Sequence, residues 1–128
     1  MTNILVVDDS IDAAELLAML FAACGHEAHV AFDGAQGLQQ ARRFAPHIIF
    51  LDLDMPILDG FGAARAIRAA PETDHPFIIA LSAKVGSDIQ ARTSAAGFDF
   101  HFQKPADSRV LLALVDDLGR RDRARPAA

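Results

Sequence analysis

The chain alternates apolar runs with segments of helical period, and this alternation limits the folds it can adopt. Five apolar runs span residues 4–7, 29–32, 48–51, 77–81 and 100–102. Short runs of β-branched and aliphatic residues are typical of strands that are buried on both faces. Because a helical segment follows each run, we predict a row of βα units. Such a chain forms a parallel sheet with right-handed crossovers and helices on both faces.

Residues at the ends of the helical segments predict where the helices begin and end. Asp12, with Glu15 at the capping-box spacing, predicts the start of the first helix, and Gly25 predicts its end. Ser87 predicts the cap of the fourth helix. The last helix is expected to start at Asp107 or Ser108 and to carry its apolar side chains on one face: Leu111, Leu114, Val115 and Leu118.

Leu16, Leu20 and Cys24 share one face of the first predicted helix. Cys24 is the single cysteine of the chain, so no disulfide within the chain is possible. We expect it to be a small buried hydrophobic residue in a reducing compartment rather than a nucleophile.

Length, composition and charge describe one globular domain. At 128 residues, with 52% hydrophobic and 23% charged residues, the chain can bury a single core. We place the domain at residues 3–118 and an Arg/Ala-rich tail at 119–128. A net charge of −5 argues against nucleic acid as the main partner. The sequence shows neither a signal peptide nor a membrane span, so we expect a soluble, cytoplasmic protein.

Polar residues follow or end four of the apolar runs: Asp8-Asp9, Asp52, Ser82 and Lys104-Pro105. The carboxyl ends of the strands in an open parallel sheet are where ligands bind. We therefore expect these pieces, far apart in sequence, to form a single site.

This set of residues fits magnesium-dependent phosphoryl transfer. Asp9 and Asp52 offer the hard oxygen ligands that Mg²⁺ prefers, and without metal the acids repel one another and raise at least one pKa. Lys104 can neutralise a transferring phosphoryl group, and Ser82 can donate to one of its oxygens. Asp52 can then act as an in-line nucleophile and become an acyl phosphate, which water hydrolyses.

The chain resembles a response-regulator receiver domain, the module that takes a phosphoryl group from a histidine kinase or a histidine phosphotransfer protein. The resemblance covers residues 3–118. It rests on Val6-Val7-Asp8-Asp9, Leu51-Asp52-Leu53-Asp54-Met55-Pro56, Asp59-Gly60, Leu81-Ser82-Ala83, Ala96-Gly97 and Lys104-Pro105. It implies a flavodoxin-like, doubly wound α/β fold with a five-stranded parallel sheet in the order 2-1-3-4-5 and five helices.

The resemblance also implies a role for each site residue. Asp52 is the phosphoacceptor. Asp9 and the main-chain carbonyl of Asp54 join it on Mg²⁺, for which Mn²⁺ could substitute, and Asp8 acts through water. Ser82 and Lys104 hold the phosphoryl oxygens. The switch consists of Ser82 and an aromatic residue three positions before the lysine, which here is His101 where Tyr or Phe is commoner.

Two further residues, Asp54 and Lys84, lie two positions after Asp52 and Ser82. Both are expected to flank the route by which water reaches the phosphoryl group. We predict that this pair tunes the lifetime of the phosphorylated state.

Other functions remain open at this point. A phosphatase of the haloacid-dehalogenase type also has an apolar strand ending in Asp-x-Asp, a hydroxyl residue, a lysine and a late acid pair, here Asp116-Asp117. A receiver-like module that only binds a partner is another alternative. A third is a receiver excised from a hybrid kinase, which Gly97-Phe98-Asp99 and His101 also resemble.

We favour a stand-alone receiver that catalyses only its own phosphorylation and dephosphorylation. Its output is expected to pass to a downstream protein through the face made by the fourth helix, the fifth strand and the last helix. A phosphorylation-dependent homodimer is possible. Contacts with nucleic acid or membrane are not expected.

Overall fold

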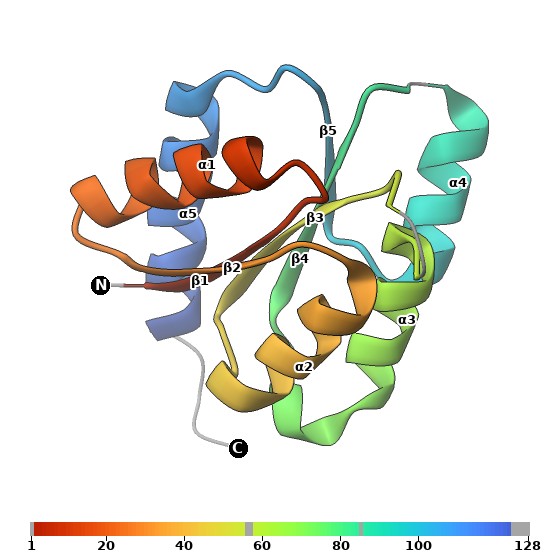
Figure 1. The fold of residues 1–128 in the computed structure, drawn as a ribbon, viewed down its shortest axis with the longest axis horizontal. Helices are drawn as coiled ribbons and strands as arrows, with labels where there is room; N and C mark the ends of the chain where they lie inside the picture. Colours follow the sequence, from red (N-terminus) through yellow and green to blue (C-terminus); the bar gives the residue numbers. More distant parts are fainter. Residues whose placement is uncertain (1, 56–57, 85, 124–128) are drawn as a thin grey trace.

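The computed structural model describes residues 2–55, 58–84 and 86–123 as one sheet with helices on both faces (Figure 1). The sheet has five parallel strands in the order β2-β1-β3-β4-β5, which confirms the predicted fold class. The strands are β1 (Asn3–Val7), β2 (Glu27–Ala31), β3 (Ile48–Asp52), β4 (Phe77–Ser82) and β5 (Phe100–Gln103). The most apolar strand, β3, is central, as expected.

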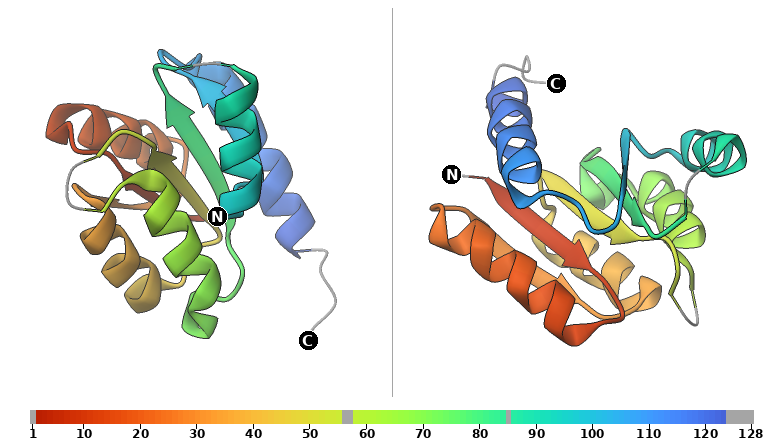
Figure 2. Two further views of the ribbon diagram at one scale, coloured as in Figure 1. Left: turned by 90° about the vertical axis from the view of Figure 1, so that its right-hand side faces the viewer. Right: turned by 90° about the horizontal axis from the view of Figure 1, so that it is seen from above.

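Four α-helices connect the strands and a fifth follows the last strand, and the five divide between the two faces (Figure 2). They are α1 (Ile11–Ala23), α2 (Gly34–Phe44), α3 (Gly60–Ala69), α4 (Ser87–Ala96) and α5 (Ser108–Arg123), with a short 3₁₀ helix, η1 (Pro71–Thr73), after α3. Helices α1 and α5 cover one face, and α2, α3 and α4 cover the other. This arrangement leaves the carboxyl ends of the strands free to carry the site.

The core has two halves because successive strand side chains point to opposite faces. In β3, Ile48 and Phe50 pack toward α1 and α5, whereas Ile49 and Leu51 pack toward α2 and α3. Phe50 stacks on Phe21 of α1 with ring centroids 5.1 Å apart. Both faces of the strand are therefore buried, which explains why its sequence is continuously apolar.

The start and the buried face of α1 differ from the prediction. Ser10, not Asp12, is the N-cap, and its hydroxyl accepts the Ala13 N–H at 3.3 Å. Asp12 lies inside the first turn, so the predicted capping box does not form. The buried positions of α1 are Ala14, Ala18 and Phe21, whereas Leu16 is 70% exposed. Cys24 is exposed rather than buried, because it is the C-cap residue at the point where Gly25 turns the chain with φ +89°.

Two other helix ends also differ. Ser87 is the first residue of α4 rather than its cap; the N-cap is Gly86, which makes no side-chain cap hydrogen bond. Helix α5 begins at Ser108 as predicted but continues past residue 118 to Arg123. Arg121 pairs with Asp117 at 2.9 Å one turn earlier, which favours this extra helical turn. The rest of the predicted tail, residues 124–128, lies outside the described residues.

Among the described residues, no helix combines the length and the apolar character that crossing a membrane requires.

Candidate functional site

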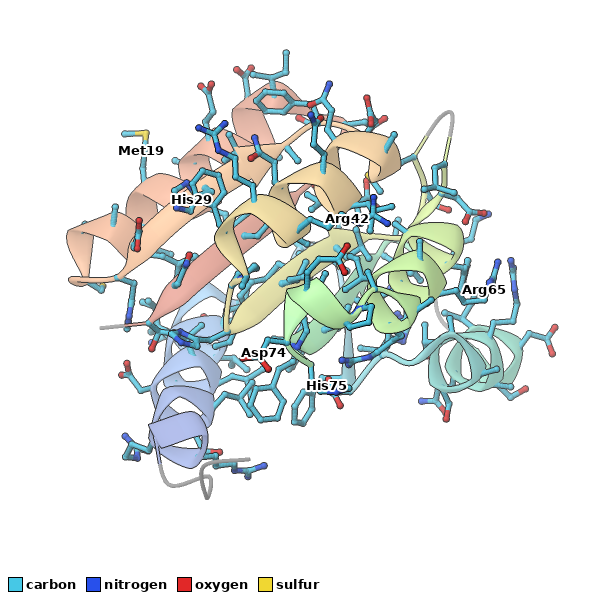
Figure 3. All side chains as sticks on the ribbon, turned by 90° about the horizontal axis from the view of Figure 1, so that it is seen from below. Met19, His29, Arg42, Arg65, Asp74 and His75 are labelled. Carbon is cyan, nitrogen blue, oxygen red and sulfur yellow. The ribbon has the colours of Figure 1, made fainter. Side chains whose placement is uncertain are left out.

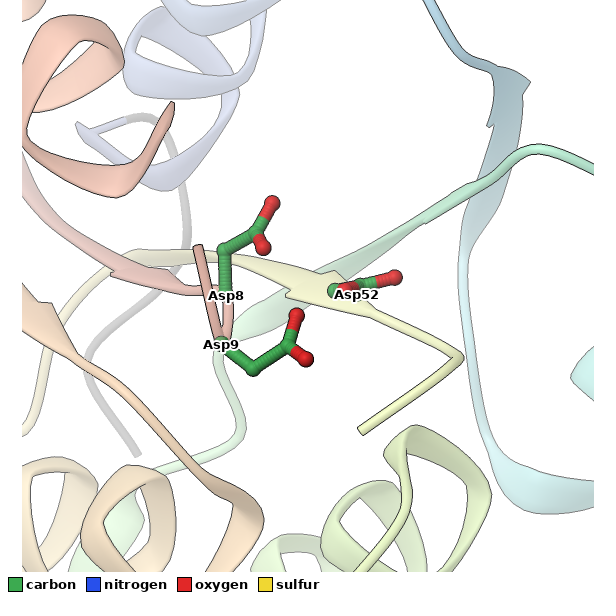
Figure 4. A group of neighbouring side chains, drawn as sticks. All are labelled: Asp8, Asp9 and Asp52. Carbon is green, nitrogen blue, oxygen red and sulfur yellow. The ribbon is translucent and has the colours of Figure 1, made fainter. Parts of the chain in front are cut away.

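Three carboxylates meet at the carboxyl ends of β1 and β3 (Figure 4). In the sheet register Val7 lies opposite Leu51, so the residues that follow them are neighbours in space. Asp8, Asp9 and Asp52 each offer an oxygen, and these oxygens all lie within 4.8 Å of one another. The strand pairing thus brings together the acids that the sequence separates.

Burial and main-chain hydrogen bonds fix two of these carboxylates. Asp8 is 5% exposed and Asp52 is 3% exposed, whereas Asp9 is exposed. The Ser10 N–H donates to Asp8 Oδ1 at 2.9 Å, and the Asp54 N–H donates to Asp52 Oδ1 at 3.1 Å. Each acid is therefore oriented by the backbone two residues further along the chain.

Lys104 reaches the acids from the end of β5. Its Nζ lies 2.9 Å from Asp8 Oδ2 and 3.5 Å from Asp52 Oδ1. Its own N–H donates to the Ser82 carbonyl at 2.8 Å, which holds the lysine backbone against the end of β4. The peptide bond to Pro105 is cis. Burial alone would lower the pKa of Lys104, but the hydrogen bond to Asp8 and the charges of Asp52 and Asp8 raise it.

The pKa of Asp52 is raised from 3.8 to about 6. Burial is the main cause, and the charges of Asp8 and Asp9 add to it, while the Asp54 N–H and Lys104 act in the opposite direction. The sequence predicted a raised pKa from repulsion between the acids. The direction is confirmed, but the removal of Asp52 from water contributes more than its acidic neighbours.

Ser82 ends β4 beside the acids and is 1% exposed. Its Oγ accepts the Lys84 N–H at 3.0 Å, so the hydroxyl is held by the loop that follows the strand. The side chains of Lys84 and Asp54 are both exposed, and each follows a buried site residue by two positions. Asp54 and Lys84 thus lie at the solvent-exposed edge of the site, whereas Ser82 is buried beside the acids.

His101 lies in β5 opposite Ala80 of β4. Its Nε2 is buried and has no hydrogen-bond partner among the residues that the structure describes. The residue lines a shallow, open pocket of about 220 Å³ together with residues of α4 and of the segment between α4 and β5. A buried imidazole nitrogen without a partner is unfavourable, so the ring is not locked in place by its polar atoms.

The donor set fits a divalent cation. Three carboxylates of the described residues converge. The ammonium group of Lys104, which contacts two of them, carries one positive charge and cannot balance three negative ones. Hard carboxylate oxygens at this spacing are the ligands that Mg²⁺ prefers, and a bound cation would relieve the repulsion between them.

The late acid pair of the phosphatase alternative lies elsewhere. Asp116 Oδ1 is 3.5 Å from His26 Nε2, and Asp117 pairs with Arg121, both on α5. Neither is part of the acidic cluster, because α5 carries them away from the carboxyl ends of the strands.

Sequence reasoning missed the role of Gly60 in positioning the site. Its N–H donates to the Leu53 carbonyl at 3.2 Å. A Cβ at this position would collide with the Asp52 carbonyl and lie 2.7 Å from the Leu53 Cα. The backbone of α3 can therefore approach the Asp52 loop only where the residue has no side chain. The Asp59-Gly60 pair was the available signal, but sequence reasoning used it only as one of the motifs that carry the resemblance.

A groove of about 650 Å³ opens beside the acidic cluster between α1 and α5. Asp8 and Lys104 form its polar end, and most of the other lining side chains are apolar, among them Leu16, Leu17, Leu20 and Leu111. Met19 of α1 is 66% exposed and points away from the body of the molecule (Figure 3). An exposed apolar surface of this kind, continuous with a polar site, is typical of an interaction surface.

Comparison with known sequences identifies relatives along nearly the whole chain. A family model for the response regulator receiver domain matches residues 4–116. The transcriptional regulatory protein PrrA of Mycobacterium leprae is 37% identical over 119 residues, which are 93% of this chain and 50% of PrrA. The response regulator PleD of Caulobacter vibrioides is 35% identical over 118 residues, which are 92% of this chain and 26% of PleD. The chain spans half or less of the length of these two relatives.

Solved structures show the same fold. Chemotaxis protein CheY4 of Vibrio cholerae has a TM-score of 0.86 at 25% identity, covering 92% of this chain and 98% of CheY4. The receiver domain of the sensor histidine kinase PA1611 from Pseudomonas aeruginosa has a TM-score of 0.82 at 27% identity, covering 92% of this chain and 98% of that one. Its active-site cleft holds a coordinated magnesium ion. On the family match, the fold and the acidic cluster, this chain belongs to the response regulator receiver domains of two-component signalling.

Proposed function

We propose that Asp52 accepts a phosphoryl group from a phosphohistidine of a histidine kinase or a histidine phosphotransfer protein. The observation that carries this proposal is the convergence of Asp8, Asp9, Asp52 and the Lys104 ammonium at one end of the sheet. An Asp52 carboxylate oxygen attacks phosphorus in line. The P–N bond breaks, its electron pair stays on the imidazole nitrogen of the donor, and the products are an aspartyl phosphate and a neutral histidine.

The chain itself supplies positioning and charge. Asp8, Asp9 and Asp52, with the Asp54 carbonyl, would hold Mg²⁺ or Mn²⁺, and the bound ion supplies charge neutralisation for the phosphoryl oxygens. Lys104 neutralises a further oxygen when it exchanges its Asp8 partner for the phosphoryl group. Ser82 donates its hydroxyl to another. These roles need no large movement because the backbone already orients Asp8 and Asp52.

The groove between α1 and α5 supports a protein rather than a free small molecule as the physiological donor. It is apolar along α1 and meets the site at Asp8 and Lys104. A protein surface that covered it would bury the exposed Leu16 side chain and could bring a histidine to Asp52.

The switch and the output form the second half of the proposal. Ser82 turns from the Lys84 N–H toward the phosphoryl group, and the His101 ring moves with it. The change is passed to a downstream protein, or to a second copy of the chain, on the face made by α4, β5 and α5. We place this receiver in the cytoplasm, with protein partners rather than nucleic acid or membrane. A receiver from a hybrid kinase is the second candidate, favoured by the match to the PA1611 receiver domain.

Labelling with phosphoramidate tests the chemistry because its P–N bond is the bond proposed to break. The full chain is incubated with and without Mg²⁺, and the intact mass is followed. We expect one phosphoryl group per chain, dependent on Mg²⁺, in wild type and in the Asp12→Asn control, and none in Asp52→Ala. Labelling that persists in Asp52→Ala, or that proceeds equally without metal, would refute the assignment. Repeated turnover of a phosphate ester would instead favour a phosphatase.

A further inference from the structure

The first turn of α2 lies against the β3–α3 loop, of which the structure describes residues 53–55 and 58–59. Gly34, the first residue of α2, is buried. A Cβ at this residue would collide with the Leu58 carbonyl oxygen and lie 2.9 Å from Leu58 Cβ. The carbonyl belongs to the backbone, which cannot rotate away as a side chain can. The helix therefore approaches the loop this closely only because residue 34 has no side chain.

The side chain of Leu58 lies against a second helix, α3. It is partly buried and packs on the core beneath α2 and α3. A Cβ at Gly62, in the first turn of α3, would lie 2.6 Å from Leu58 Cδ1. Helices α2 and α3 contact each other and lie side by side (Figure 1). One residue of the loop is thus held by two helices, with its carbonyl against α2 and its side chain against α3.

Helix α2 is itself held against β1, next to the first acid of the site. Gly37 is buried one turn after Gly34, and a Cβ there would lie 3.1 Å from both methyl carbons of Val7. Val7 precedes Asp8 in the chain, and the Asp8 N–H donates to the Ala31 carbonyl at the end of β2 at 3.1 Å. The start of α2 cannot move away from the loop without losing this packing on β1. A group inserted at residue 34 would therefore displace the loop.

A displacement of Leu58 reaches the site through Gly60, two residues later. The backbone of Gly60 lies against the Asp52 carbonyl, and its N–H donates to the Leu53 carbonyl at 3.2 Å. The next residue, Asp54, donates its N–H to Asp52 Oδ1 at 3.1 Å. The backbone that orients the Asp52 carboxylate is therefore in direct contact with the end of the loop that Leu58 holds.

We propose that Leu58 is a positioning residue for the divalent-cation site and that Gly34 is the surface against which it is set. Neither residue offers a ligand atom, and both act through Gly60 on the backbone of residues 52–54. The Asp54 carbonyl, one of the proposed ligands, belongs to that backbone. Loss of a contact that supports metal ligands typically costs about 10- to 100-fold in affinity. The effect on the cation rests on the proposed function, whereas the effect on the metal-free loop does not.

Magnesium titration of the full chain, followed by NMR amide shifts, tests the effect on the site. Gly34→Ala should raise the dissociation constant for Mg²⁺ about tenfold, because the new methyl group displaces the Leu58 backbone. Alanine forms a helix better than glycine does, so the helix itself would not be weakened.

Gly62→Ala is the matched control for Gly34→Ala. It adds the same methyl group to the first turn of the neighbouring helix, but this group meets the end of the Leu58 side chain, which can rotate. Its dissociation constant for Mg²⁺ should stay close to that of wild type. An unchanged constant in Gly34→Ala, or an equal increase in both variants, would overturn the proposal.

The metal-free spectra measure the position of the loop without any cation. In Gly34→Ala we expect amide shift changes at Asp54 and Gly60 and faster hydrogen exchange at the Gly60 N–H, which bonds across the loop. Gly62→Ala should change the shifts near Leu58 and leave Asp54 as it is. Changes in Gly34→Ala that stop at α2 and Leu58 would contradict the connection through Gly60.

Leu58→Ala provides a second variant if Gly34→Ala does not fold. It removes the side chain that packs against α3, so the loop is held less firmly and the affinity for Mg²⁺ should fall. Leu58→Met keeps an apolar side chain of similar volume and should bind Mg²⁺ as wild type does. Equal affinities in Leu58→Ala and wild type would contradict the role of Leu58.

Asp52→Asn separates a failure of this proposal from a failure of the proposed function. It removes a proposed ligand and should weaken Mg²⁺ binding. If wild type and Asp52→Asn bound Mg²⁺ equally well, the cation site itself would be wrong. The metal-free spectra of Gly34→Ala would still decide whether Leu58 positions the loop.

Discussion

At the scale of single residues, the site depends on a few side chains held by backbone groups. Asp8 and Asp52 each accept a main-chain N–H from two residues ahead, and Ser82 does the same. This shared local pattern fixes three polar groups at three strand ends without any help from a ligand. His101 differs from them, since its buried Nε2 has no hydrogen-bond partner within the described part of the chain.

Replacing His101 by phenylalanine should stabilise the protein. The change removes an unsatisfied buried polar atom and keeps an aromatic ring, which corresponds to about 1 kcal/mol in the free energy of unfolding. Urea unfolding of both proteins measures the difference. His29→Phe is the control, because His29 Nε2 already has Glu27 Oε1 at 3.2 Å. If His101→Phe were no more stable than wild type, the unpaired Nε2 of His101 would not lower the free energy of unfolding.

Truncation of Lys84 or Asp54 should shorten the lifetime of the phosphorylated state. Both side chains are exposed at the edge of the site, and removing either one widens the path of water to the phosphoryl group. A barrier lowered by about 0.5–1.4 kcal/mol corresponds to roughly 2- to 10-fold faster hydrolysis. Loss of phosphoryl label after removal of the donor gives the rate for Lys84→Ala and Asp54→Ala. Unchanged rates in both variants would end this hypothesis.

At the scale of elements, the sequence correctly predicted the strands and helices that depend on the spacing of apolar residues. The five strands and five helices occur in the predicted order because burial on both sheet faces requires continuous apolar runs. The predicted cap of α1 was wrong. The Ser10 N–H donates to the Asp8 carboxylate, which holds Ser10 at the cap position, and helical spacing does not reveal this contact. Sequence reasoning missed the hydrogen bonds of Arg68 for a related reason, because its Nε and Nη1 donate to the main-chain carbonyls of Gly97 and Pro76, which carry no signal in the sequence.

Substitution at Ser10 and at Asp12 separates the observed cap from the predicted one. Ser10→Ala removes the hydroxyl that accepts the Ala13 N–H and should lower the free energy of unfolding by about 1 kcal/mol. Asp12→Ala should cost less, about 0.5 kcal/mol, because Asp12 only complements the helix dipole in the first turn. Thermal unfolding at fixed pH measures both. A larger loss for Asp12→Ala than for Ser10→Ala would indicate that Asp12, not Ser10, caps the helix.

At the scale of the whole molecule, the candidate site lowers the stability of the protein that it belongs to. The fold gathers Asp8, Asp9 and Asp52 at one edge of the sheet and buries two of them. Buried like charges oppose folding unless they are neutralised. The site therefore couples folding to protons, to a divalent cation and, in our proposal, to the phosphoryl group through the same carboxylates.

Stability of the metal-free protein should fall as pH rises through the range in which Asp52 ionises. The folded-state pKa of about 6 lies above the ordinary value of 3.8, so the folded protein holds this proton more tightly than the unfolded chain. The stabilising effect of the proton is complete below the unfolded value and is lost as pH rises to about 6. The expected loss in the free energy of unfolding is on the order of 2–3 kcal/mol. Urea unfolding from pH 4 to pH 7 should show this loss in wild type but not in Asp52→Asn.

Magnesium should reverse the loss above pH 6, because it binds the ionised carboxylates of the folded state and not the dispersed ones of the unfolded chain. At ten times its dissociation constant the expected gain is about 1.4 kcal/mol. The gain should shrink at pH 4, where protons compete for the same oxygens, and Asp52→Asn should reduce it at every pH. Equal gains in wild type and Asp52→Asn would place the cation elsewhere on this acidic protein. A gain confined to wild type at neutral pH would show that proton and metal stabilise the fold through Asp52.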